Sequence, residues 1–256
     1  MTDLPIPYAE QPVREQRAID TLRGTDAPSV GELFGFMREA ETRFESLRLR
    51  LLDRTFTARG EQLATVELWL RHPGRARIVT RRGEGPVSRD FDVWLSDGET
   101  VQTYNASSRT TTRRPPMATV VGGTDPALPG FARTYSPRTK LPRESIVEMV
   151  VHPHGFCRNV LATGPVSIQG ATELAGDREC LLLRADHPRT SHLLTDRPDR
   201  WLEVGVDRMT GLILLYVEHI RDLVTRHVEV ADLELDAPIP DEAFSIHIPE
   251  GTASIY

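Results

Sequence analysis

The sequence predicts an α+β protein that is mainly β and is built on one antiparallel sheet. In residues 65–71, Val66, Leu68 and Leu70 alternate with polar residues and a tryptophan, which is typical of a half-buried antiparallel strand. His-Pro-Gly at 72–74 cannot continue a strand, and Asp-Gly at 97–98 is a strong hairpin signal. With 256 residues, 39% of them apolar, one large domain is expected.

Residues 1–27 are predicted to be a flexible N-terminal leader, because they are polar, rich in proline and poor in apolar positions. Residues 28–256 are then expected to form the folded domain. A first helix should begin at Ser29, since Ser29 and Glu32 have the spacing of a capping box. Its apolar stripe is Leu33, Phe36, Met37, Ala40, Phe44 and Leu47, and its charged face is Arg38, Glu39, Glu41 and Glu45.

Strands are expected on both sides of a central irregular segment. Residues 117–141 contain four clusters of Gly or Pro and are predicted to form a long loop across the open side of the sheet. A second helix should start at 142–144 and be apolar on nearly all sides, so it must be covered. The predicted strands are 47–59, 65–71, 75–82, 91–96, 99–104, 166–172, 179–185, 201–206, 212–220 and 224–235, with a closing strand within 237–251.

Three stretches resemble one known superfamily. They are residues 68–73, residues 96–105 and the turn at 207–212, which has the form Asp-x-x-Thr-Gly-Leu. They resemble the bacterial lipoprotein carrier LolA and its relatives, which include LolB-like receptors, the sigma-factor regulator RseB and mycobacterial lipid-carrier lipoproteins. The resemblance covers roughly residues 29–251.

This resemblance implies a single strongly curved, half-open antiparallel β-sheet with two short helices as a lid on its concave side. It implies a non-enzymatic protein that binds an acyl chain, a lipid or the lipid part of a lipoprotein, as carrier or sensor. The alternative is an RseB-like regulator that binds a protein, of the anti-sigma or envelope-stress type, with a vestigial cavity. The side chains expected to face the cavity are Phe36, Met37, Phe44, Leu68, Leu70, Val93, Ile146, Met149 and Val150.

His72 is the expected lid-gating position. In LolA the residue before the corresponding proline is an arginine that hydrogen-bonds the lid, and an aromatic residue follows three places after the proline. This chain has His72 and Ala76 there. A histidine can donate to lid carbonyls but carries charge only where its surroundings permit. Gating of the LolA kind is therefore in doubt.

His152, His154 and Cys157 could bind zinc if His187 or His192 completed the set. A proline between the two histidines and the lack of a second cysteine pair weaken that interpretation, so we predict a loop and neither metal nor cofactor. Cys157 and Cys180 are compatible with one disulfide or with two buried thiols, and thiols are favoured in a chain without an export signal.

A local basic region stands out on an acidic chain. It is either a solvated sheet exterior, which we favour, or a surface for an anionic lipid or acidic partner. The region consists of Arg71, Arg75, Arg77, Arg81, Arg82, Arg109, Arg113 and Arg114.

The net charge of −6 argues against nucleic-acid binding. No apolar run is long enough to span a membrane, and no catalytic motif appears. As written, the chain is expected to be cytoplasmic; it would be extracytoplasmic if its N-terminus were misassigned or trimmed.

Overall fold

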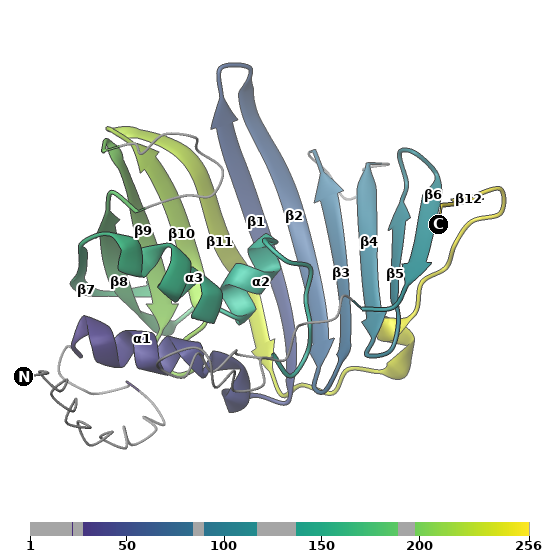
Figure 1. Ribbon diagram of the computed structural model, residues 1–256, viewed down its shortest axis with the longest axis horizontal. Helices are drawn as coiled ribbons and strands as arrows, with labels where there is room; N and C mark the ends of the chain where they lie inside the picture. Colours follow the sequence, from purple (N-terminus) through teal and green to yellow (C-terminus); the bar gives the residue numbers. More distant parts are fainter. Residues whose placement is uncertain (1–21, 23–27, 84–89, 117–136, 189–197, 256) are drawn as a thin grey trace, which may run out of the picture.

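The computed structural model describes residues 22, 28–83, 90–116, 137–188 and 198–255. Twelve strands of this part of the chain form a single curved sheet in the order β12-β6-β5-β4-β3-β2-β1-β11-β10-β9-β8-β7 (Figure 1). The strands β12 and β7 lie at opposite ends, so the sheet is a half-open layer. All of its pairs are antiparallel except that of β12 with β6.

Ten of the twelve strands, all but β6 and β12, agree with the predicted strands to within about five residues. Two-residue periodicity, turn residues and β-branched side chains were thus sufficient to locate these ten. The twelve strands are β1 (Ser46–Thr57), β2 (Gly60–Arg71), β3 (Arg75–Arg82), β4 (Phe91–Asp97), β5 (Val101–Asn105), β6 (Thr110–Arg114), β7 (Val166–Leu174), β8 (Arg178–Asp186), β9 (Arg200–Asp207), β10 (Ile213–Ile220), β11 (Leu223–Leu235) and β12 (Ala253–Ser254).

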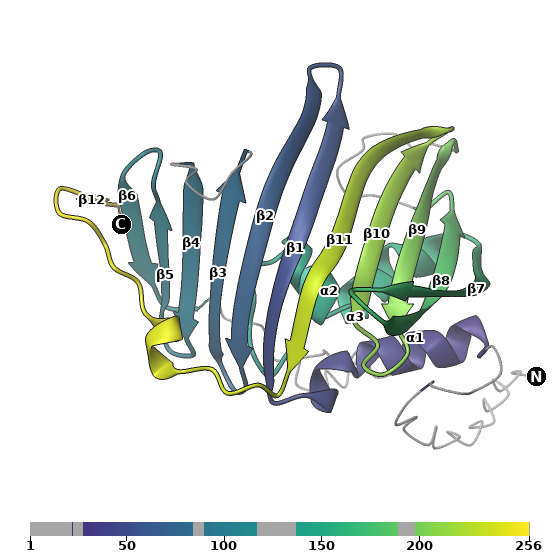
Figure 2. The same ribbon diagram turned by 180° about the vertical axis from the view of Figure 1, so that it is seen from behind.

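All of the α-helices of the described residues lie on one face of the sheet. They are α1 (Val30–Arg38), α2 (Ile146–Val151) and α3 (His154–Asn159), with the 3₁₀ turns η1 (Ala40–Arg43) and η2 (Leu161–Thr163) between elements. They cross the lower part of β1 and β7–β11 in Figure 1 and lie behind the sheet in Figure 2. We call the face toward these helices the concave face. None of these helices is long and apolar enough to span a membrane.

The first helix begins as predicted, with Ser29 accepting from the Glu32 amide and Glu32 accepting from the Ser29 amide. The prediction for its second half was wrong. The α-helix ends at Arg38, and residues 40–43 form a 3₁₀ turn. A 3₁₀ turn advances each residue by a larger angle than an α-helix does, so Glu41 points inward and is only 2% exposed instead of lying on the charged face.

The second helix starts at Ile146, two to four residues later than the predicted start at 142–144, because Ser145 caps it by accepting from the Glu148 amide. Residues 154–159, predicted as loop, form α3. The predicted closing strand was also wrong, since residues 241–244 form the 3₁₀ turn η3 (Asp241–Phe244) and only residues 253–254 pair, with β6.

The long loop predicted at 117–141 lies outside the described residues except for its last five, 137–141. The leader prediction for residues 1–27 likewise lies outside them, apart from Leu22. Leu22 is 1% exposed, and its amide donates to the Arg208 carbonyl over 2.9 Å. At this one position the chain is packed on the domain.

The turn at residues 207–211 fixes α1 on the sheet. Asp207 is fully buried and accepts from the amide and the hydroxyl of Thr210, and Gly211 has a φ of +79°. A Cβ at Gly211 would lie 3.1 Å from Met37 Cα and from the Phe36 carbonyl oxygen. Glycine is therefore required for the backbone conformation and for the close approach of α1.

We predict that Gly211→Ala destabilises the fold more than Gly176→Ala. Both glycines have positive φ, but a Cβ at Gly176 meets nothing within 4 Å. The difference between the two variants therefore measures the packing of α1, and we expect about 1 kcal/mol in the free energy of unfolding. Urea denaturation of both proteins checks this, and equal losses would contradict it.

Candidate functional site

The concave face and the helices that cover it bring together eight of the nine predicted cavity residues. Six of these side chains are at most 2% exposed, so the lid and sheet pack directly against each other: Phe36, Met37, Phe44, Leu68, Leu70 and Val150. Ile146 and Met149 of α2 are partly buried. Ile146 contacts both apolar clusters of this face, one centred on β1 and β2 and the other on β8–β10.

Val93 was wrongly expected on this face. In the sheet register Leu68 pairs with Ile78, Ile78 pairs with Trp94, and Val79 pairs with Val93. Val93 and Val79 therefore point to the opposite, convex face, where they form a small cluster with Tyr104. The concave residue of β4 is Trp94, which packs on the same cluster as Leu68.

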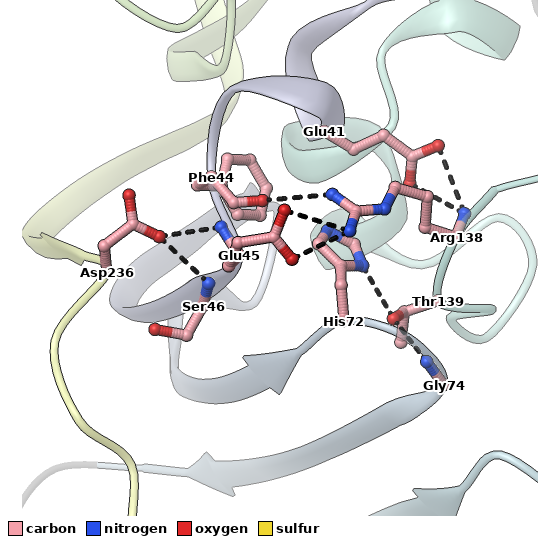
Figure 3. Close-up of polar contacts among 9 residues, drawn as sticks. All are labelled: Glu41, Phe44, Glu45, Ser46, His72, Gly74, Arg138, Thr139 and Asp236. Carbon is pink, nitrogen blue, oxygen red and sulfur yellow. Dashed lines mark hydrogen bonds and ion pairs between the residues drawn. The ribbon is translucent and has the colours of Figure 1, made fainter.

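A short segment, residues 137–139, ties the lid to the corner between β2 and β3 (Figure 3). The Arg138 amide donates to both carboxylate oxygens of Glu41, over 3.2 and 3.1 Å. The Gly74 amide donates to the Arg138 carbonyl and to the Thr139 hydroxyl. This group of contacts, with His72 and His152, is called the lid anchor below.

His72, the predicted gating residue, lies in the lid anchor. It is 7% exposed, stacks on Phe44 with a centroid distance of 5.3 Å, and its Nδ1 lies 2.8 Å from the Thr139 hydroxyl. Its Nε2 has no hydrogen-bond partner among the described residues. Burial is the main cause that lowers the pKa of His72 to about 4, so the imidazole is neutral at pH 7.

His152 follows α2 and lies against Glu41. Its Nε2 lies 2.9 Å from the Thr139 carbonyl, which can only accept, so Nε2 carries a proton. Its Nδ1 is 3.2 Å from Glu41 Oε2, and both side chains are almost completely buried. Burial is the main cause that lowers the pKa of His152 to about 4, so this imidazole is neutral at pH 7.

Exposed charges surround this buried core of the lid anchor. The Arg138 guanidinium pairs with Glu45 over 2.8 Å, and Asp236 accepts from the Glu45 and Ser46 amides (Figure 3). This pairing with Arg138 is the main cause that lowers the pKa of Glu45. The segment that follows β11 and the start of β1 are thereby held beside the lid anchor.

The structure separates the residues of the hypothetical zinc site. His152 is used in the lid anchor, His154 begins α3, and Cys157 Sγ lies 3.8 Å from Met37 Sδ. His187 is exposed, and His192 lies outside the described residues. No group of three potential metal ligands occurs within the described ranges. Cys157 and Cys180 are buried as free thiols in different apolar clusters, and burial raises the pKa of each to about 12.

Most charges of the predicted basic region that lie within β2 and β3 are paired. Arg71 and Arg75 bond to Asp241, Arg81 bonds to Glu67, and Arg82 bonds to Asp92. Arg77 lies over the Trp69 ring, 5.3 Å from its centroid. These contacts agree with a solvated, internally neutralised surface.

Sequence reasoning missed most of the lid anchor. Glu41 had been placed on the charged helix face, and Arg138 and Thr139 in a loop without assigned contacts. No periodicity marks them, because their positions depend on the end of α1 and on the turn at residues 72–74.

The geometry defines the class of protein: a half-open antiparallel sheet whose concave face is covered by short helices. No protein-family model matches the chain, and no curated protein matches it. Solved structures do. The crystal structure of MucB, an RseB protein, is similar with a TM-score of 0.50 and 14% identity, covering 85% of this chain and 62% of that chain. The chain has the LolA/LolB/RseB-like fold.

Two further similar structures have lower TM-scores. A LolA superfamily protein from Nitrosomonas europaea is 9% identical with a TM-score of 0.34, covering 86% of this chain and 99% of that chain. LprF from Mycobacterium bovis is 9% identical with a TM-score of 0.40, covering 90% of this chain and 100% of that chain. The chain spans about three fifths of the length of MucB.

We predict that the fold loses stability in mild acid partly through His72. The pKa of His72 is about 4 in the folded protein and 6.5 ordinarily. The contribution of neutral His72 to the free energy of unfolding is therefore complete above pH 6.5 and is lost as the pH falls toward 4. The free energy of unfolding of His72→Gln should depend less on pH over that range. The control His247→Gln, at an exposed position, should keep the wild-type dependence. An unchanged slope for His72→Gln would contradict the assignment.

We also predict that Glu41→Ala costs about 1–3 kcal/mol of stability, because it removes the buried carboxylate that accepts from the Arg138 amide. The control is Glu45→Ala on the same segment. Glu45 is 73% exposed at its side chain, so its loss should cost much less. Guanidinium denaturation compares the two, and an equal cost would show that burial of Glu41 is unimportant.

Proposed function

We propose that the protein is a non-enzymatic binding protein that holds an acyl chain, of a lipid or of an acylated protein, between the lid helices and the concave face. One observation carries this proposal: α1 and α2 present apolar side chains to an apolar sheet face, so lid and face form one interior. Such an interior can hold a hydrocarbon chain without specific polar contacts. The role would be that of a carrier or a sensor.

The packing described above is that of a closed lid, so binding requires movement of lid side chains. The movable part is α2, a six-residue helix between Pro142 and Pro153. Its apolar residues Val147, Val150 and Val151 would be replaced by the ligand chain. Each buried methylene contributes about 0.8 kcal/mol, so a long chain can offset the loss of these contacts.

The test is binding of palmitate to the wild-type protein and to Met149→Glu, followed by native mass spectrometry and calorimetry. Met149 is partly buried on α2, so a carboxylate there should leave the fold intact, as circular dichroism can verify, but prevent an acyl chain from lying under the helix. We expect binding to fall more than tenfold. The control Met209→Glu changes the same residue type at a position that is 42% exposed and should bind normally.

Organic extraction of protein purified without detergent provides a second measurement. A co-purifying lipid that is absent from Met149→Glu would support the proposal. A clean apo mass that is unchanged by fatty acids and phospholipids would contradict it.

The complete packing of the interior favours a second candidate, an RseB-like regulator that binds a protein partner. In that case the lid would stay closed and the outer surface would be used. A clean apo mass, together with a free energy of unfolding that lipids leave unchanged, would favour this candidate.

A further inference from the structure

A row of polar side chains crosses the concave face beyond the helices. On β1 the buried concave residue Leu51 is followed, two positions later, by Asp53, and on β11 Val228 is preceded by Arg226. Asp53 accepts two hydrogen bonds from Arg226, over 2.9 and 2.7 Å. This bond is the main cause that raises the pKa of Arg226.

The row continues to both sides. Toward β9, Glu218 is opposite Arg226 in the register and accepts from Arg200 over 2.5 Å. Toward β4, Arg82 donates to Asp92 over 2.5 Å, and Asn105 donates to the same carboxylate. In the sheet order β5-β4-β3-β2-β1-β11-β10-β9, every strand except β2 therefore contributes a polar side chain to this row.

On β2 the corresponding residue is Ala64, which pairs with Asp53 on one side and with Arg82 on the other. A cleft of about 700 Å³ opens at this point of the sheet. Its size is within the ordinary range for small-ligand sites. It is lined by Asp53, Thr55, Glu61, Gln62, Leu63, Ala64, Arg82 and Gly83.

We propose that this cleft binds the polar headgroup of the ligand, and that the headgroup is uncharged and carries hydroxyl groups. The inference rests on the proposed function: the chain would lie under the lid and the headgroup would lie in the cleft. The register places the cleft only one concave position from the apolar interior, since the buried Val66 follows Ala64 two positions later, on the same face of β2. An amphipathic molecule can therefore occupy both.

The charge pairing selects the headgroup chemistry. Asp53 is paired with Arg226, Glu61 with Arg54, and Arg82 with Asp90 and Asp92. Among the described lining residues, an anionic headgroup would meet carboxylates and a cationic one would meet guanidinium groups, and none of these residues offers an unpaired counter-charge to offset its desolvation. A hydroxyl both donates and accepts, so it can bridge Asp53 and Arg82 without adding charge.

The test uses three amphiphiles with the same dodecyl chain, measured below their micelle concentrations: dodecyl glucoside, dodecanoate and dodecyltrimethylammonium. Calorimetry should show that the glucoside binds about tenfold more tightly than the two ions, which corresponds to two additional hydrogen bonds. Ala64→Leu fills the floor of the cleft and should abolish this preference. The control Thr65→Leu adds a similar side chain on the opposite face of the same strand and should retain it.

The outcomes separate the two proposals. Equal binding of all three amphiphiles, or a preference that survives Ala64→Leu, would overturn the headgroup site and leave the acyl-chain proposal intact. If none of the three amphiphiles binds, both the headgroup site and the acyl-chain proposal are overturned. A glucoside preference that is lost in Ala64→Leu and kept in Thr65→Leu would establish the site.

Discussion

The burial of apolar side chains between the lid and the concave face is the interaction on which the rest of the structure depends. Leu49, Leu68 and Leu70 of the central strands are at most 2% exposed, as are Val147 and Val150 of α2. A short helix has little intrinsic stability, so α2 exists because this face needs a cover and because Ser145 caps its start. The lid anchor then determines where the cover sits, using Glu41 and Thr139 as buried acceptors.

The same strands change character along their length. On β1 the concave positions are apolar as far as Leu51 and polar from Asp53 onward, and β11 changes between Val228 and Arg226. In Figure 1 the helices cross the lower parts of β1 and β11 and leave the upper parts of both strands uncovered. A charged side chain under the lid would lose its hydration at a large cost in free energy. Beyond the lid, charged side chains can pair with each other and remain partly hydrated. The division of the concave face into a covered apolar part and an open polar part is therefore a single physical consequence of where the helices end.

Local sequence signals predicted most of the fold and less of the site. Alternation located the strands, and the capping residues located the start of α1, because these signals need only neighbours in the chain. Val93 was misplaced because its face depends on the register between β3 and β4, which no local pattern fixes. Glu41 was misplaced because helical periodicity was extended past Arg38. The position of Asp53 within an apolar alternation was a usable signal for the polar row. A charged residue at a position that points to the buried face of a strand requires a partner.

A closed, well-packed lid and a binding function place opposite demands on α2. Filling the interior with its own valines stabilises the empty protein, but the same contacts compete with any ligand chain and reduce its apparent affinity by the population of the open state. The anchor residues affect this balance without contacting the ligand. His72 and His152 are buried, and burial lowers the pKa of each to about 4, so protonation opposes the closed arrangement and acid would shift the lid toward opening. Ligand affinity and lid stability are therefore expected to vary in opposite directions as the anchor is altered, because one interior is shared by the lid and the ligand.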